Sequence, residues 1–178
     1  MKLPFDEIIE LSRNRLTFNT SIQKSAEDIE DEIEELLVMS YALGWGLLDE
    51  ELGEDTPIDN KRLADTLEEK INGKTYKEYL APHIEDEDID GIYRVVDSEI
   101  HRMYSAGQYD NAKTNGKQYK TWRTMEDDKV RDMHRNLDKV KVGIDEKFYT
   151  TDGDSAVRPG QFSLPENNVN CRCLVKYT

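Results

Sequence analysis

The sequence lacks the features that define several large classes of protein. No run approaches the roughly 18 consecutive apolar residues of a membrane-spanning helix, and residues 1–20 carry acidic side chains where a signal peptide would be apolar. The 178 residues include only two cysteines, too few for an extracellular disulfide framework. We therefore expect a chain that is made and folds in a cytoplasm, without membrane association.

Clustered positive charge is also missing. The formal net charge is -14, and the acidic excess is concentrated at 27–35, 49–55 and 85–90. A protein that binds nucleic acid by itself needs clustered Lys and Arg, so direct nucleic-acid binding is disfavoured. The acidic runs fit either solvated helix faces or a surface that docks on a basic partner.

The clearest predicted element is a helix over 22–43, which carries a heptad seam. Its seam positions alternate in steps of four and three: Ile22, Ala26, Ile29, Ile33, Leu36, Ser40 and Leu43. Such a seam packs inside a helical bundle, which we favour, or supports self-association through the 22–43 helix. Gly44 and Gly46 permit either a close helix–helix approach or a kink.

Other helices are expected before and after this one. The pattern predicts a short amphipathic stretch over 5–11 with a break at 17–21, an Asp59-capped helix reaching Ile71, a Thr75-capped helix ending before Pro82, and a long helix over 86–114. On the long helix, Glu99 lies at the edge of the apolar stripe, whereas His101 and Arg102 lie off it. An edge glutamate can organise a neighbouring loop through backbone N–H groups, or can simply be solvated.

After the turn at Asn115-Gly116 the pattern changes to short strands and loops. We expect a strand over 119–124, a helix over 128–137, one or two strands over 140–148, a long loop over 150–168 and a final strand over 169–177. The fold class is therefore α+β. A predominantly helical acidic region, 1–115, precedes a small module, 116–178, of short antiparallel strands, one helix and a long loop.

Three side chains of the module form the candidate chemical site. His134 shares its predicted helix face with Val130 and Leu137, and Cys171 and Cys173 lie two apart on the predicted last strand. A disulfide between such neighbours would be strained, so free thiols or metal-bound thiolates are expected. One imidazole and two sulfurs can bind zinc, with Asp132, Asp138 or a water as fourth ligand.

Two other interpretations of these residues stay open. They can be buried core cysteines beside a satisfied histidine, without any metal. They can also form a Cys–His nucleophilic pair, with Asn168 or Asn170 as the orienting group.

A series of separate motifs resembles the phage Mu protein F-like family of minor head, or head-morphogenesis, proteins. The motif residues are Lys120, Trp122, Thr124, Asp128, Val130, Arg131, Asp132, His134, Leu137, Asp138, Asp145, Glu146, Phe148, Pro159, Gly160 and the run Asn168–Cys173. The resemblance covers about residues 90–178, with a looser fit at Glu99 and Arg102. The family usually has glycine where this chain has Lys139, so a different turn geometry is expected there.

The resemblance implies a low-copy capsid protein that acts in procapsid assembly, DNA packaging or ejection. Its partners would be the portal or the major capsid protein, and its place the capsid interior of a virion made in a bacterial cytoplasm. Some longer relatives carry a toxin or nuclease domain after the Cys-Arg-Cys motif, and no such cargo is expected here because the sequence stops at Thr178.

The resemblance also adds weight to His134, Cys171 and Cys173 as ligands of a structural zinc. It gives Trp122 and Asn170 a structural role, and suggests that Asp128, Arg131 and Asp132 tie the long loop down by charge-assisted hydrogen bonds. We expect no enzymatic activity. The alternative is a metal- or cysteine-dependent hydrolase, a nuclease or protease of head maturation.

Overall fold

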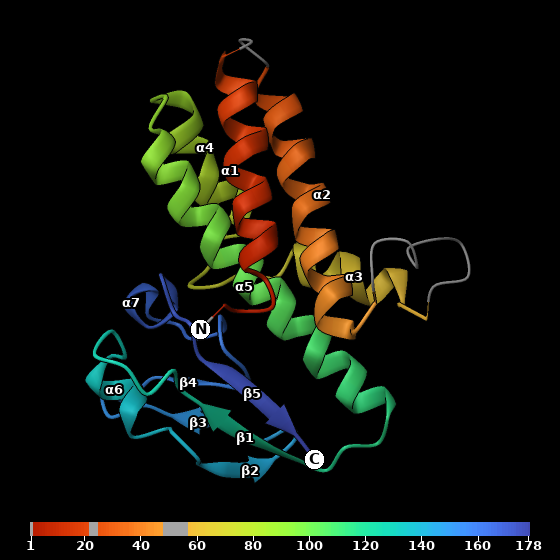
Figure 1. The fold of residues 1–178 in the computed structure, drawn as a ribbon, viewed down its shortest axis with the longest axis vertical. Coiled ribbons are helices and arrows are strands. Elements are labelled where there is room, and N and C mark those ends of the chain that lie inside the picture. The colour runs from red at the N-terminus through yellow and green to blue at the C-terminus, as the bar shows by residue number, and fades with distance from the viewer. Residues whose placement is uncertain (1, 22–24, 48–56) are drawn as a thin grey trace.

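The computed structural model describes residues 2–21, 25–47 and 57–178, and it confirms the α+β class. A group of packed helices forms one part of the molecule, and the short strands gather against one end of it (Figure 1). The helices of the first part are α1 (Asp6–Ser21), α2 (Ala26–Trp45), α3 (Asn60–Leu67), α4 (Tyr76–Glu85) and α5 (Ile89–Thr114). None of the described helices is long and apolar enough to cross a membrane.

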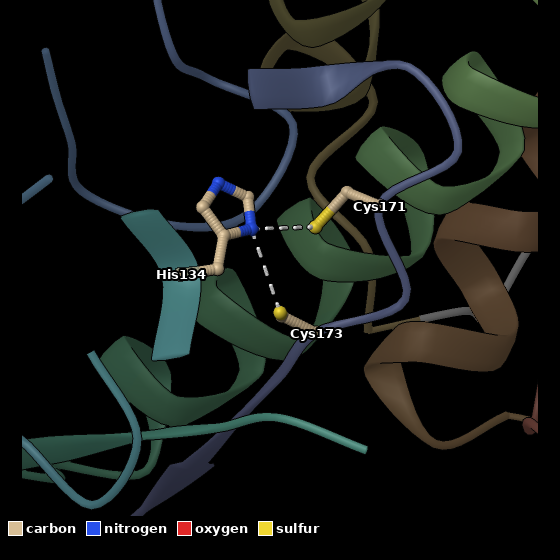
Figure 2. A group of neighbouring side chains, drawn as sticks. All are labelled: His134, Cys171 and Cys173. Carbon is tan, nitrogen blue, oxygen red and sulfur yellow. Dashed lines mark hydrogen bonds between the residues drawn. The ribbon is translucent and has the colours of Figure 1, made fainter. Parts of the chain in front are cut away.

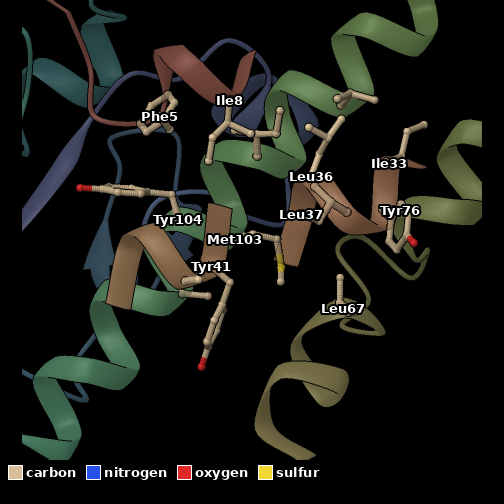
Figure 3. Close-up of a cluster of buried hydrophobic side chains, with 14 of the residues drawn as sticks. Phe5, Ile8, Ile33, Leu36, Leu37, Tyr41, Leu67, Tyr76, Met103 and Tyr104 are labelled. Atoms are coloured by element: carbon tan, nitrogen blue, oxygen red, sulfur yellow. The ribbon is translucent and has the colours of Figure 1, made fainter. Parts of the chain in front are cut away.

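The heptad seam of α2 is buried inside this chain, mainly against α5. Ile29, Ile33, Leu36 and Ser40 are all buried, and the Ser40 hydroxyl donates to the Ile100 carbonyl at 2.7 Å. Residues from α1, α2 and α5 meet in one hydrophobic cluster (Figure 3). Intramolecular packing therefore occupies the seam that self-association would use. Ala26 at its start is exposed, and Ile22 lies outside the described residues.

Two glycines allow α2 and α5 to approach closely. A Cβ atom added to Gly44 would overlap the Tyr104 carbonyl oxygen, and one added to Gly107 would overlap that of Tyr41. Of the two alternatives at Gly44, the structure therefore has close helix approach. Gly46 instead ends α2 as a left-handed C-cap with φ 100°.

Several predicted helix boundaries are wrong, two because the helix continues through an expected stop and one because the helix ends earlier than expected. The break expected at 17–21 is absent, since α1 continues to Ser21. Helix α4 includes Pro82, because Leu80 is buried and Ile84 packs on the same hydrophobic cluster beyond the proline. Helix α3 ends at Leu67, before the predicted Ile71, because Ile71 and Lys74 form a tight turn with two backbone hydrogen bonds of 2.9 and 3.2 Å.

Local capping signals predict several helix starts correctly. The Asp59 carboxylate accepts the backbone N–H groups of Lys61 and Arg62, and Thr75 and Glu78 form the expected capping box. Ser25 caps α2, which begins four residues later than the predicted start at Ile22.

The C-terminal module is built on a three-stranded antiparallel sheet in the order β2-β1-β5. Its elements are β1 (Tyr119–Arg123), α6 (Asp132–Arg135), β2 (Lys141–Gly143), β3 (Phe148–Tyr149), β4 (Ser155–Ala156), α7 (Pro165–Asn168) and β5 (Leu174–Tyr177). In the central strand, Lys120 lies opposite Val142 and Tyr177, and Trp122 lies opposite Val175. The 128–137 helix shrinks to one turn, and the predicted loop contains β4 and α7, so the module has two short helices rather than one. The final strand begins at Leu174, so the two cysteines precede it.

The module covers the face of α5 that the sequence pattern left polar. His101 and Arg102, which were predicted to lie off the apolar stripe, are buried there beneath the module. The stripe indicates only which residues of the helix pack against the other helices. Gly160, at φ 83°, packs its backbone directly on Arg102, where a side chain would clash. Hydrogen bonds join residues on the two sides of the predicted domain boundary at 115/116. The division into two domains stays a prediction.

A shared carboxylate completes this joint between helices and module. Glu69 accepts from Arg102 at 3.1 Å, from Arg158 at 2.9 Å and from the Gln161 amide at 2.5 Å. Arg158 also donates to the Arg102 carbonyl at 3.0 Å. Glu99 accepts from Arg102 Nε at 2.7 Å, so it organises a side chain rather than the backbone of a loop.

The predicted 150–168 loop is ordered around Asp154. Its buried carboxylate accepts hydrogen bonds from the Ser155, Ser163 and Leu164 backbone, from the Ser163 hydroxyl and from the Asn167 amide. Burial alone would raise the pKa of Asp154, but these hydrogen bonds outweigh it and lower the pKa to about 2.

Lys139 stands in a left-handed conformation, with φ 65°. Its backbone N–H donates to the Trp122 carbonyl at 2.9 Å, which joins the turn after α6 to the central strand. The turn is thus one that favours glycine, and here a lysine occupies it, with ion pairs to Glu126 at 2.8 Å and Asp138 at 3.3 Å.

We predict that Gly107→Ala lowers the free energy of unfolding by about 1–3 kcal/mol, because the new methyl group forces α2 and α5 apart. Chemical denaturation measures this change. Ser98→Ala, on the same helix, serves as control and should be nearly neutral. Equal effects of the two substitutions would contradict close packing at Gly107.

We predict that Lys139→Gly raises the free energy of unfolding by about 1 kcal/mol, because glycine adopts positive φ without steric cost. Exposed ion pairs contribute only about 0–1 kcal/mol, so their loss should not reverse the sign. Lys139→Ala removes the same ion pairs but keeps the Cβ, and should destabilise. If both variants destabilise equally, the ion pairs rather than the backbone decide stability at this turn.

Asp154 should make stability depend on pH in the acid range. Its pKa is depressed in the folded state, so it contributes stability above its unfolded pKa near 4, and this is lost as pH falls toward about 2. The pKa difference corresponds to about 2 kcal/mol. The free energy of unfolding of Asp154→Asn should therefore differ most from that of the parent above pH 5, and the two values should converge near pH 2. Urea titrations across this pH range measure both values. A difference that stays constant with pH would show that the carboxylate charge is not the cause.

Candidate metal centre

His134, Cys171 and Cys173 come together at one point of the module, as predicted. The His134 Nδ1 atom lies 3.7 Å from each sulfur, and the three candidate ligand atoms all lie within 4.8 Å of one another. The imidazole comes from α6 and both thiols from the segment before β5 (Figure 2). All three side chains are at least 95% buried, and both cysteines are free thiols.

Aromatic rings set the orientation of the imidazole. His134 stacks on Phe162 with ring centroids 5.4 Å apart, and Trp122 meets it edge-on at 5.9 Å. Trp122 also contacts Phe148 and Phe162, and it is fully buried at the centre of the second hydrophobic cluster. Trp122 was predicted to have a structural role. In the structure it packs against the ring of His134.

The backbone before β5 is held by hydrogen bonds that aim both thiols at His134. Arg131, the N-cap residue of α6, donates to the Val169 carbonyl. Asn170 is exposed and left-handed, with φ 55°, so it serves as a turn residue. We predicted that a regular strand over 169–177 would make both cysteines face the same way. In the structure, the hydrogen bond from Arg131 and the turn at Asn170 have this role instead.

His101 is the contributor that sequence reasoning missed. Its Nε2 atom lies 2.8 Å from the Cys173 carbonyl oxygen, and its ring packs on Phe5 with centroids 5.0 Å apart. It therefore joins α5 to the cysteine segment without being one of the three clustered ligands. One sign of this role was present in the sequence: His101 lies on the side of the long helix for which no apolar partner was predicted.

The predicted acidic partners of the site lie elsewhere. Asp128 and Asp132 are exposed, and the carboxylate of Asp132 contacts Arg135 at 3.4 Å on its own helix. Asp138 accepts from the backbone and hydroxyl of Thr124 at 2.9 and 3.0 Å. Of the three charged residues expected to tie the 150–168 loop down, Arg131 donates to the carbonyl of Val169, the residue that follows that loop. Among the described residues, neither Asp132 nor Asp138 joins the metal-ligating cluster.

The two thiols differ strongly in their readiness to ionise. The pKa of Cys171 is lowered, first because the Cys173 thiol donates a hydrogen bond to it and also because His134 lies beside it. The pKa of Cys173 is raised, first because its thiol donates a hydrogen bond to Cys171, and also because burial and a charge on Cys171 disfavour a second thiolate. Without a cation, the site thus favours one thiolate facing one thiol.

Two cavities adjoin this arrangement. A cavity of about 10 Å³ adjoins the three side chains, lined also by Arg131, Asn170 and Arg172. That volume holds about one water molecule. Cys171 also lines a second cavity, of about 420 Å³, together with His101 and Arg131, so the nucleophilic interpretation is weakened by the burial of the thiols and not by a lack of space nearby.

Comparisons with known proteins agree with the motif pattern. The family model described as Phage Mu protein F like protein matches residues 60–176. The minor head protein GP7 of Bacillus phage SPP1 is 31% identical over 83 residues, which are 45% of this chain and 27% of that protein. This chain therefore spans well under two thirds of that relative, and no solved structure matches.

The matched region is longer than the stretch from about 90 that carried the resemblance. It begins at α3 and so includes Glu69, the carboxylate shared by Arg102 and Arg158. The joint between helices and module thus lies inside the family region, together with His134, Cys171 and Cys173. This chain belongs to the phage Mu protein F-like family.

Proposed function

We propose that this chain is a non-enzymatic minor head protein, which acts in procapsid assembly by associating with the portal or the major capsid protein. The observation that carries the proposal is the family match over 60–176. The name of the related SPP1 protein, a minor head protein, supports the same role. The place of action is the capsid interior of a virion assembled in a bacterial cytoplasm.

The burial of the thiol cluster supports a role without catalysis. A hydrolase needs a nucleophile or metal-bound water that a substrate can approach. His134, Cys171 and Cys173 instead lie buried, beside a cavity for about one water molecule. The hydrolase alternative therefore has its chemical groups, but they are almost fully buried, although Cys171 also lines a cavity of about 420 Å³.

The distribution of charge supports protein partners rather than DNA. Residues 1–115 contain 28 acidic and 12 basic residues, whereas residues 116–178 contain 10 and 12. On α2, Glu27, Asp31 and Glu35 recur every four residues and are exposed. Such a face repels phosphate and complements a basic protein surface, so any part in DNA packaging or ejection would act through partners.

Co-expression with the portal protein, and separately with the major capsid protein, of the same phage tests the proposal. We expect co-purification with one of them, and incorporation of the chain into virions. Absence from virions together with failure to co-purify with either protein would overturn the proposal.

Charge reversal on α2 tests the docking face. The double substitution Glu27→Lys, Asp31→Lys should weaken co-purification at least tenfold and shift the remaining binding to lower salt. Asp132→Lys reverses an equally exposed charge on α6, at the far side of the module from α2 (Figure 1), and should bind like the parent. Unchanged binding of the double variant would place the docking surface elsewhere, while leaving the assembly role intact.

A further inference from the structure

We propose that His134 Nδ1 and the sulfurs of Cys171 and Cys173 bind one Zn²⁺ ion, with a water molecule as an exchangeable fourth ligand. The ion holds α6 to the segment before β5. This assignment is independent of the proposed assembly role, and its test uses the isolated chain.

The spacing of the three atoms matches tetrahedral zinc. Zn–S bonds of about 2.3 Å and Zn–N bonds of about 2.0–2.1 Å at tetrahedral angles separate nitrogen from sulfur by about 3.6 Å. The two observed separations are both 3.7 Å. The sulfurs fall within the same 4.8 Å limit, compared with about 3.8 Å in a tetrahedral site. Both nitrogen–sulfur separations therefore suit a shared zinc ion.

The donor set selects the metal. Two thiolates and an imidazole are soft or borderline ligands, which favour zinc over magnesium or calcium. Binding releases the remaining thiol proton, that of Cys173, to solvent and leaves the neutral imidazole protonated on Nε2. The doubly negative sulfur pair, which is unfavourable without a cation, is then balanced by the charge of the ion.

The fourth ligand does not come from the acidic residues that the sequence suggested. Asp132 is fully exposed, and Asp138 is occupied by Thr124. His101 directs Nε2 to the Cys173 carbonyl. Among the described residues the cluster thus has three members, and the adjoining cavity of about 10 Å³ has room for one water.

The structural consequence is a cross-link between distant parts of the module. His134 is separated from the cysteines by 37 and 39 residues. Helix α6 has four residues, far too few to be stable by itself. A metal bond from its third residue fixes this turn to the strand that closes the sheet, so removal of zinc should loosen α6 before the helical part.

Metal analysis of the purified chain tests the ligand set. We expect one zinc per chain after reconstitution, and at least a tenfold loss of bound zinc in Cys171→Ser, Cys173→Ser and His134→Gln. His101→Gln is the matched control, because it changes a buried histidine that also contacts the cysteine segment, and it should keep its zinc. If the parent binds no zinc, or if His101→Gln loses it as His134→Gln does, the assignment is wrong.

Cobalt substitution tests the coordination without requiring a folded variant. Co²⁺ in the parent chain should show thiolate charge-transfer bands and the strong visible bands of a four-coordinate site. Added azide should shift these visible bands by replacing the water. Six-coordinate spectra would overturn the tetrahedral site, and bands insensitive to azide would overturn the exchangeable fourth position.

Discussion

Two buried guanidinium groups and one shared carboxylate fix the C-terminal module on the helices. Arg102 of α5 and Arg158 of the module both contact Glu69, and each arginine is almost fully buried. Burial alone would raise the pKa of Glu69, but the charges of Arg158 and Arg102 hold it below its usual value. Buried ion pairs are poor sources of net stability, yet breaking one leaves an uncompensated charge. The joint therefore determines where the module sits more than how stable the protein is.

The candidate metal centre depends on this joint. Residue Arg102, which anchors the module, follows His101, which contacts the Cys173 carbonyl. Gly160 packs on the same turn of α5, and its lack of a side chain lets the loop of the module reach the helix. The cysteine segment is thus placed by α5 from one side, while Arg131 and the aromatic wall of Trp122 and Phe162 place it and His134 from the other.

These features suit a protein that binds partners through a preformed surface. The helical part presents an acidic, solvated face, whereas the module is nearly balanced in charge and is held rigid by buried polar contacts. Asp154 gathers five hydrogen bonds at the centre of a loop that would otherwise be mobile, so the surface it presents is preformed. A preformed surface costs little entropy on docking, which favours assembly at a defined position in a larger particle.

By itself, the sequence determined the features whose signals are local. The caps at Asp59 and Thr75, the seam of α2, the strand at 119–123 and the meeting of His134 with Cys171 and Cys173 all follow from spacing or from motif order. Only the tertiary structure decided the rest. Burial of Arg102, the passage of α4 through Pro82 and the reduction of α6 to one turn depend on which surfaces meet. Glu69 lies 33 residues from Arg102 and 89 from Arg158, and no local pattern encodes a contact across such distances.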